Sequence, residues 1–281
     1  MRDAWVHTVE AATVLVTGAT DGLGRELAAS LSGVGAHVLV HGRNRQRVDE
    51  TVAELAQEGR ADAYVADFAD LGDVARLAEQ VEADHSRLDV LVNNAGIGAG
   101  PPDRNERERS ADGHELRFQV NYLAAFLLTR LLRPLLQASA PARVVNVASG
   151  AQQAIDFDDI MLERGYDGWR AYSQSKLAMV ADAITLSEQL DPAQVTVNSL
   201  HPASLMDTKL VRESCGSASS SVDEGVTAVL RLVADPELEQ VTGRYFSGQS
   251  PAKAAGQVYD RSARLELARR SEELVAPYVG E

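Results

Sequence analysis

Short apolar runs and longer amphipathic segments alternate along the chain. The apolar runs are rich in β-branched residues and are bounded by glycine, asparagine or serine, as is typical of strands buried on both faces. They lie at 14–16, 38–40, 90–92, 144–145 and 195–200. Segments with helical spacing lie at 23–31, 48–55, 74–81, 116–136, 178–190, 222–233 and 260–275. This βαβα order predicts an α/β fold, a doubly wound parallel sheet of the Rossmann type with helices on both faces.

The domain organisation follows from the absence of repeats and linkers. No segment of fixed period and no Pro/Gly/Ser-rich linker divides the sequence, so we expect a single domain over residues 13–281 behind an N-terminal extension, residues 1–12. Two long connections, at 98–113 and 204–220, interrupt the compact pattern. Long loops often cover binding sites, and we expect the second one to be a lid. The alternative is that each is a surface insertion without function.

A glycine-rich loop, Thr-Gly-Ala-Thr-Asp-Gly-Leu-Gly at 17–24, joins the first predicted strand to the first predicted helix. Its glycines permit a tight turn and close approach to a pyrophosphate, and a helix N-terminus offers free N–H groups to an anion. In this context the loop predicts dinucleotide binding. The second strand ends in His41-Gly42-Arg43 without a carboxylate, so Arg43 favours the 2′-phosphate of NADP. Asp21 opposes that assignment through its charge, and Arg43 could also be a solvated strand-end residue.

Polar residues also stand where catalysis is expected. Tyr172 and Lys176 are four apart at the start of a helical pattern, so they share one helix face. An ammonium group beside a phenol lowers the phenol pKa, as a tyrosine acid/base near neutral pH requires. Alone, the pair could equally be an exposed helical pair. Ser149 and the motif Asn-Asn-Ala-Gly at 93–96 follow strands, at the edge where open parallel sheets bind ligands.

The ordered motifs together carry a family resemblance. Thr-Gly-x-x-x-Gly-x-Gly, Asn-Asn-Ala-Gly, a helix asparagine, a strand-end serine and Tyr-x-x-x-Lys occur in the order found in the short-chain dehydrogenase/reductase superfamily, which the chain resembles over residues 13–250. Tyr-Ser-Gln-Ser-Lys-Leu-Ala at 172–178, His201-Pro202, Gly-Arg-Tyr-Phe at 243–246 and an insertion around 155–165 are similar to its retinol-dehydrogenase-like carbonyl reductases. This resemblance implies hydride transfer between nicotinamide and a carbonyl or secondary alcohol.

The resemblance also implies a role for each matching residue. Tyr172 would be the acid/base, Ser149 would hold the substrate oxygen, Lys176 would bind the nicotinamide ribose, and Asn121 would hold a water. The implied cofactor residues, with NADP(H) favoured over NAD(H), are Gly18, Thr20, Asp21, Gly22, Leu23, Gly24, Arg43, Asp67, Phe68, Asn94, Tyr172, Lys176 and Thr208. One position departs from the pattern, since Ala203 follows Pro202 where glycine is usual. That departure puts the geometry around Thr208 in question.

The composition of the chain opposes several classes of partner. The 41 acidic and 27 basic residues give a formal charge of −14, which opposes binding to nucleic acid. A single cysteine, Cys215, excludes a disulfide framework and a thiolate zinc site, and we expect no metal. No secretion signal and no apolar stretch long enough to span a bilayer are visible. We therefore expect a cytoplasmic protein without a membrane partner.

The substrate and the oligomeric state are less constrained. Apolar residues near the predicted lid favour a small to medium, partly apolar substrate, or they simply pack the lid: Leu205, Met206, Leu210 and Val211. Two other functions compete: an inactive NADP(H)-binding sensor, which the intact catalytic set opposes, and an epimerase or dehydratase, which the short remainder after residue 250 opposes. Relatives often pair through the helices that carry Asn121 and Tyr172, so a homo-oligomer is conceivable. A face buried within one chain explains the same apolar pattern.

Overall fold

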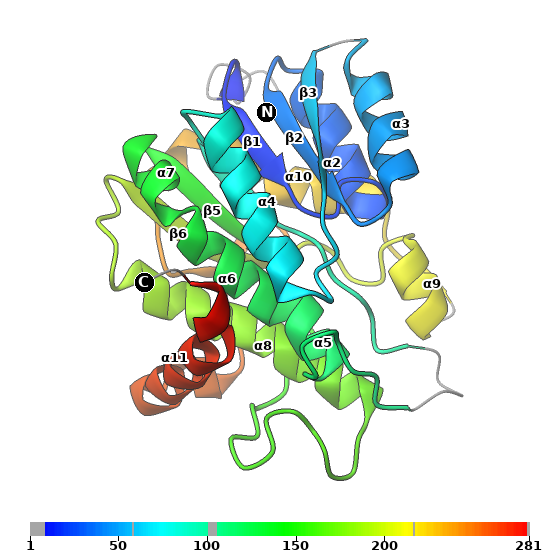
Figure 1. The fold of residues 1–281 in the computed structure, drawn as a ribbon, viewed down its shortest axis with the longest axis vertical. Coiled ribbons are helices and arrows are strands. Elements are labelled where there is room, and N and C mark those ends of the chain that lie inside the picture. Colours follow the sequence, from blue (N-terminus) through cyan, green and yellow to red (C-terminus); the bar gives the residue numbers. More distant parts are fainter. Residues whose placement is uncertain (1–8, 58, 101–105, 216, 280–281) are drawn as a thin grey trace.

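The computed structural model describes residues 9–57, 59–100, 106–215 and 217–279. Within these residues the chain forms a single α/β domain around an eight-stranded sheet (Figure 1). The strands are β1 (Thr13–Val16), β2 (His37–Gly42), β3 (Arg60–Val65), β4 (Val90–Asn93), β5 (Ala142–Val147), β6 (Val195–His201), β7 (Tyr245–Ser247) and β8 (Ser250–Ala252). Their order is β3-β2-β1-β4-β5-β6-β7-β8. The doubly wound arrangement is confirmed.

Three strands lay outside the five predicted apolar runs. β3 carries Arg60 and Asp62 among small residues and lies at an edge of the sheet, so its side chains are mostly half-buried and it lacks a continuous apolar run. β7 and β8 have three residues each, too few for a pattern to emerge. β8 runs antiparallel to β7. The sheet is otherwise parallel as predicted; at this edge a tight turn at 248–249 reverses the chain, since a parallel neighbour would need a crossover connection.

Helices cover both faces of the sheet (Figure 1). One layer contains α2 (Gly22–Ser32), α3 (Arg45–Leu55) and α10 (Val222–Ala234). The other contains α4 (Leu71–Asp84), α5 (Leu116–Phe118), the π-helical turn η1 (Gln119–Leu123), α6 (Ala124–Leu131), α7 (Arg133–Ala138) and α8 (Gly168–Ser187). Side chains alternate along each strand, so Leu15 joins the core under α8 whereas Val14 and Val16 join the core under α2.

The helix boundaries show where local sequence signals sufficed. A capping box opens α10, since the Ser221 side chain accepts from the Glu224 backbone and the Glu224 side chain accepts in return. The segment predicted as one helix over 116–136 is instead divided into α5, η1, α6 and α7. The segment predicted at 178–190 begins earlier, at Gly168. Its first turns carry polar residues that are nevertheless buried, which hides the apolar spacing.

The C-terminal helix α11 (Arg261–Val275) covers part of α8. The Tyr122 hydroxyl and the Ser271 hydroxyl form a buried hydrogen bond of 2.7 Å, and Arg264 pairs with Glu188 at the end of α8. Much of the apolar face at Asn121 and Tyr172 is thus buried within one chain. This favours the intramolecular explanation of that face, while a homo-oligomer stays a prediction.

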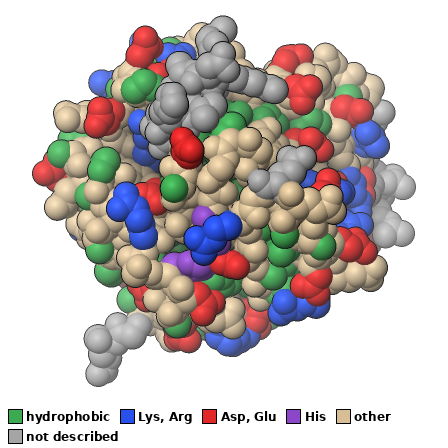
Figure 2. Space-filling view, turned by 90° about the horizontal axis from the view of Figure 1, so that it is seen from above, with side chains coloured by type: hydrophobic (Ala, Val, Ile, Leu, Met, Phe, Trp, Pro, Cys, Tyr) green, Lys and Arg blue, Asp and Glu red, His purple; other side chains and the backbone are tan. Residues whose placement is uncertain are grey.

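The chain ends and the surface add three observations. Residues 1–8 of the predicted extension lie outside the described residues, but Val9 is buried and the Ala11 N–H donates to the Gly35 carbonyl. On the face shown in Figure 2, acidic and basic side chains are interspersed, with histidines among them. Among the described residues, no helix combines the length and the apolar character that a membrane span requires.

Candidate active site

The residues predicted to bind the cofactor and the substrate lie at one edge of the sheet. The glycine-rich turn follows β1, the Asn-Asn-Ala-Gly motif begins at the end of β4, and Ser149 follows β5. These strands are parallel, so their carboxyl ends meet at the same edge. The segment 204–220 follows β6 and contains a helix that was not predicted, α9 (Lys209–Cys215), which stands beside this edge in Figure 1.

The glycine-rich turn is held by buried contacts that only glycine allows. Gly18 has φ of +67°, and a Cβ there would come within 2.9 Å of the Ala95 Cα. A Cβ on Gly24 would lie 2.2 Å from the Gly18 carbonyl oxygen. The Asn94 amide donates to the carbonyls of Thr17, at 2.8 Å, and Gly18, at 3.2 Å. Asn94 therefore fixes the turn; its binding to the cofactor, which the resemblance implied, stays a prediction.

His41 is a second support of the turn, and sequence reasoning missed it. The Gly18 N–H donates to its Nδ1 at 3.3 Å, while its Nε2 donates to the Ala66 carbonyl at 3.1 Å. Burial lowers the pKa of His41 to about 4, so the ring is neutral at pH 7 and can accept as drawn. Phe68 stacks on the ring with centroids 4.5 Å apart and is 4% exposed. The Phe68 ring therefore packs in the core. The Asp67 carboxylate, next to it in sequence, accepts a hydrogen bond from the Ala69 N–H at 3.0 Å.

Among the described charged groups around the turn, Arg43 stands without a partner. Asp21 caps α2 by accepting from the Gly22 N–H at 2.8 Å, and its other oxygen lies 3.4 Å from Arg47. Arg43 is exposed and forms no hydrogen bond or ion pair with any described residue. The charge of Asp21 is thus partly offset by Arg47, and the guanidinium of Arg43 is available to an anion. Thr20 and Leu23 complete the turn, with Thr20 half-buried and Leu23 buried.

Asn121 and Lys176 converge on Gly96. Asn121 lies in η1 and is fully buried; its amide donates to the Ile97 carbonyl and to the Ser175 hydroxyl, each at 3.0 Å, and its oxygen accepts from the Ile97 N–H at 2.7 Å. The Lys176 ammonium donates to the Val147 carbonyl at 2.8 Å. A Cβ on Gly96 would lie 3.1 Å from Asn121 Oδ1 and 3.4 Å from Lys176 Nζ. Any side chain at this position would lie against both polar groups, so glycine leaves room beside them.

Lys176 also ties the helix of Tyr172 to the strand that precedes Ser149. Burial lowers the pKa of Lys176 to about 8. Tyr172 is 9% exposed, and its ring meets Trp169 edge-on at 5.9 Å. The Ser149 hydroxyl oxygen accepts from the Ala151 N–H at 3.1 Å, so its proton is free to be donated elsewhere. The lysine, the tyrosine and the serine therefore belong to one assembly of α8 and β5.

The segment 204–220 packs directly on the turn and on the loop after β4. A Cβ on Gly22 would lie 3.2 Å from the Thr208 methyl, and one on Gly98 would lie 3.2 Å from Leu210. Met206 likewise packs on Gly225 of α10. Met206 and Leu210 therefore pack the segment onto the body of the protein, as the alternative explanation of these apolar residues held. Leu205, by contrast, is 42% exposed.

A buried polar network joins the two other loops that border the site. Arg117 donates to the Gly98 carbonyl at 2.9 Å and to the Tyr166 hydroxyl at 2.8 Å. The Tyr166 hydroxyl donates to Glu115 at 3.1 Å, and Glu115 is 1% exposed. The insertion before Tyr172 is thus anchored to the loop that follows β4. Spacing alone could not reveal this contact, because Arg117 and Tyr166 are far apart in sequence.

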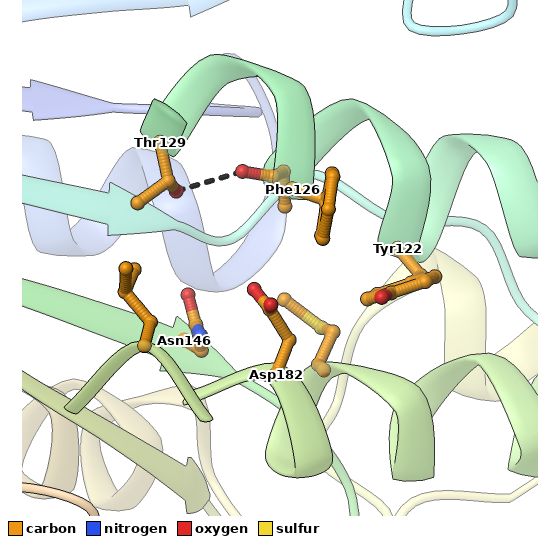
Figure 3. Close-up of a pocket in the computed structure, with 8 residues that line it drawn as sticks. Tyr122, Phe126, Thr129, Asn146 and Asp182 are labelled. Atoms are coloured by element: carbon orange, nitrogen blue, oxygen red, sulfur yellow. Dashed lines mark hydrogen bonds between the residues drawn. The ribbon is translucent and has the colours of Figure 1, made fainter. Parts of the chain in front are cut away.

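A small cavity lies between α6 and α8, next to the assembly of α8 and β5 that holds Lys176 (Figure 3). Its volume is about 10 Å³, room for roughly one water molecule. Figure 3 shows the Asp182 carboxylate reaching from α8 toward α6, with Asn146 beside it. Arg130 pairs with Asp182 at 2.8 Å. The four predicted catalytic side chains do not line this cavity, so it is separate from the candidate active site.

The strand order, the glycine-rich turn and the polar edge define a Rossmann-type dinucleotide-binding oxidoreductase. A family model described as short chain dehydrogenase matches residues 12–216, and the chain belongs to this family. The chain is 36% identical to retinol dehydrogenase 14 of Homo sapiens, with 94% of this chain and 86% of that protein covered. It is 35% identical to polyprenol dehydrogenase of Mus musculus, with 90% and 80% covered.

Solved structures agree with this assignment. A crystal structure of an uncharacterised protein from Mycobacterium paratuberculosis matches with a TM-score of 0.77 and 27% identity, covering 96% of this chain and 95% of that one. A short chain dehydrogenase from Escherichia coli CFT073 complexed with NADPH matches with a TM-score of 0.70 and 25% identity, covering 87% and 99%. The protein is an NAD(P)-dependent oxidoreductase that acts on alcohol and carbonyl groups.

Proposed function

We propose that this protein is an NADPH-dependent reductase of a small to medium, partly apolar aldehyde or ketone, with Tyr172 as the acid. The observation that carries the proposal is the convergence of Lys176 and Asn121 on Gly96, one turn of α8 from Tyr172 and beside the strand that leads to Ser149. Relatives are named as retinol and polyprenol dehydrogenases, which supports an apolar alcohol or aldehyde. In the reverse direction the same groups would oxidise the alcohol.

The residues of the turn fit a dinucleotide phosphate. Gly18 and Gly22 adopt positive φ, which lets the backbone turn tightly, and α2 begins at the turn and directs free N–H groups toward an anion. Arg43 supplies an unpaired guanidinium for the 2′-phosphate. Lys176 would hold the nicotinamide ribose, and Thr208, above Gly22, would border the nicotinamide end. When bound, the reduced nicotinamide supplies the hydride.

The chemistry of the substrate falls to three side chains. Ser149 donates a hydrogen bond to the carbonyl oxygen, which polarises the C=O bond. As hydride reaches the carbonyl carbon, the C=O π electrons move to oxygen and Tyr172 transfers its hydroxyl proton there, leaving a phenolate. The Lys176 ammonium stabilises this phenolate, since opposite charges in a buried site attract strongly. Asn121 would hold a water through which the proton is restored from solvent.

The deciding experiment follows nicotinamide absorbance while purified protein, with NADPH or NADH, meets a panel of ketones, aldehydes and quinones that includes retinal and short isoprenoid aldehydes. We expect NADPH oxidation with at least one apolar member. Tight NADPH binding without any turnover would shift the function to that of a binding protein. Failure to bind either cofactor would contradict the proposal as a whole.

The cofactor preference is tested by Arg43→Asp. Loss of a charged contact to the 2′-phosphate is expected to weaken NADPH binding by roughly 10- to 100-fold, because such hydrogen bonds contribute about 1.5–3 kcal/mol, while NADH binding is unchanged or stronger. The measurement is the Kd of each nucleotide from fluorescence titration. Arg45→Asp, an exposed arginine two residues on that pairs with Asp49, is the matched control. Equal losses in both variants would show that Arg43 contributes only to the general field.

A further inference from the structure

Two histidines and an aspartate meet at the opposite edge of the sheet from the candidate active site. His37 is the first residue of β2, Asp62 lies within β3, and His85 follows the last residue of α4. The registers His37↔Arg60 and Leu39↔Asp62 put His37 and Asp62 on the same face, the one that α4 covers. On the face drawn in Figure 2, histidine side chains reach the surface beside acidic and basic groups.

The ligand atoms of this cluster have the spacing of a metal site. His37 Nε2 lies 2.7 Å from Asp62 Oδ2, His85 Nε2 lies 3.6 Å from the same oxygen, and all three atoms are within 4.8 Å of one another. In a tetrahedral zinc site with bonds of about 2.0–2.2 Å, neighbouring ligand atoms are roughly 3.3–3.6 Å apart. The His85–Asp62 separation already has this value, and binding one ion requires the His37 and Asp62 atoms to move apart.

The surroundings favour a cation. His37 and His85 are largely buried, with side-chain exposures of 8% and 12%, whereas Asp62 is 48% exposed and leaves a path to water. The carboxyl end of α4 points at the cluster, and the adjacent Asp84 adds negative charge. Arg60 lies near enough to oppose it.

Tyr64 contacts the same His85 nitrogen that would bind the metal. Its hydroxyl donates to Asp84 at 3.0 Å and lies 2.7 Å from His85 Nε2. In that arrangement His85 Nε2 carries a proton, so binding a metal requires a change of tautomer and the release of the tyrosine hydroxyl. This tautomer change and the loss of the hydrogen bond lower the affinity for the metal. They leave the tyrosine hydroxyl beside the fourth coordination position.

We propose that His37, Asp62 and His85 form a binding site for a divalent transition metal of the zinc type. Two imidazoles and a carboxylate suit such an ion, whereas Mg²⁺ and Ca²⁺ prefer oxygen ligands alone. Water fills the fourth position. The site joins β2, β3 and the end of α4 far from the catalytic edge, so the ion stabilises the fold and takes no part in hydride transfer.

The experiment uses full-length, tag-free protein that has been treated with a chelator and dialysed. Isothermal titration with Zn²⁺ is expected to give one ion per chain, with Mg²⁺ as the hard-cation comparison. His37→Ala, His85→Ala and the near-isosteric Asp62→Asn are each expected to weaken Zn²⁺ binding at least tenfold. His114→Ala is the matched control, because His114 lies outside the cluster and bonds to Gln119. Circular dichroism verifies that each variant is folded.

Thermal unfolding gives an independent readout. Zn²⁺ is expected to raise the Tm of the wild type and of His114→Ala, and to leave the Tm of the three cluster variants unchanged. Co²⁺ in place of Zn²⁺ is expected to show the visible absorption of a tetrahedral site in the wild type alone. Zn²⁺ binding that is equally tight in the cluster variants would overturn the proposal. So would a wild type that binds no Zn²⁺ at concentrations of about 100 μM.

Discussion

The catalytic framework and the segment 204–220 border the same site but are held in different ways. The framework is built from buried polar groups whose partners come from distant parts of the chain: Asn94 with the glycine turn, Asn121 with Ile97, and Lys176 with Val147. The segment packs on the body through Met206 and Leu210, and its backbone hydrogen bonds are internal, with the Ser219 and Ser220 N–H groups donating to Leu205 and the Asp207 N–H to Ser220. Its two ion pairs among the described residues, Asp207 with Arg212 and Lys209 with Glu213, are exposed.

This difference indicates which part of the site can move. Breaking a buried hydrogen bond leaves an unsatisfied group and costs about 1–3 kcal/mol, so the framework resists displacement. An exposed ion pair contributes little, and the segment can separate from the body without stranding buried polar groups. We therefore expect framework variants to lose chemistry or stability, and variants of the segment to change substrate affinity while the fold persists.

The largest expected effect is that of Tyr172→Phe. Removing the acid should lower kcat by about 10²- to 10⁴-fold, the usual contribution of a general acid, while NADPH binds as before. Steady-state kinetics and a fluorescence titration measure the two quantities separately. Tyr259→Phe, at a tyrosine that is 53% exposed, is the control. Undiminished turnover in Tyr172→Phe would assign the acid to another group.

Lys176→Met tests the electrostatic part of the framework through pH. The pKa of Lys176 is about 8 when folded and ordinarily 10.5, so between these values the unfolded chain binds the extra proton. Unfolding free energy from this group therefore rises with pH from about 8 to 10.5, by about 3 kcal/mol at most. Urea unfolding of the apo protein at pH 7.5 and pH 10 measures this change. The free energy of unfolding of the wild type, relative to that of the methionine variant, should be higher at pH 10. A constant difference would mean that the ammonium stays charged throughout.

Gly24→Ala probes the packing of the turn. The added methyl would overlap the Gly18 carbonyl, so we expect a loss of about 1–3 kcal/mol in unfolding free energy together with weaker binding of both nucleotides. Urea unfolding gives the first quantity and titration gives the second. Gly256→Ala is matched to it, because no atom lies within 4 Å of a Cβ at Gly256. If both glycine variants behaved alike, the close approach at Gly24 would have no energetic weight.

The smallest effect on stability is expected from the segment 204–220, the predicted lid. Replacing residues 209–218 by two glycines keeps Thr208 and joins backbone that already meets at Asp207 and Ser220. We expect KM to rise several-fold or kcat to fall, with unfolding free energy changed by no more than about 0.5 kcal/mol. Asp207→Asn, which removes only the exposed ion pair, should be neutral. Full activity of the shortened protein would make the segment a surface insertion.

Local patterns in the sequence determined most of the fold. Strands buried on both faces, such as β1 and β4, read as continuous apolar runs, and the capping box at Ser221 is contained within four residues. The glycine turn, the strand-end Ser149 and the Tyr172–Lys176 pair are also local patterns. Parallel order then places them at one edge, because the carboxyl ends of parallel strands coincide. The family followed from the order of these motifs.

Tertiary structure alone decided the contacts between distant residues. The edge strand β3 is half-exposed, and the strands β7 and β8 are short and depend on neighbours for their hydrogen bonds. None of these three strands therefore shows a periodic pattern. His41 beneath Gly18 and the meeting of His37, Asp62 and His85 arise from registers and packing across the sheet. Periodicity reports how a segment faces its core, whereas such contacts depend on which segments become neighbours, and that is fixed only when the whole chain has packed.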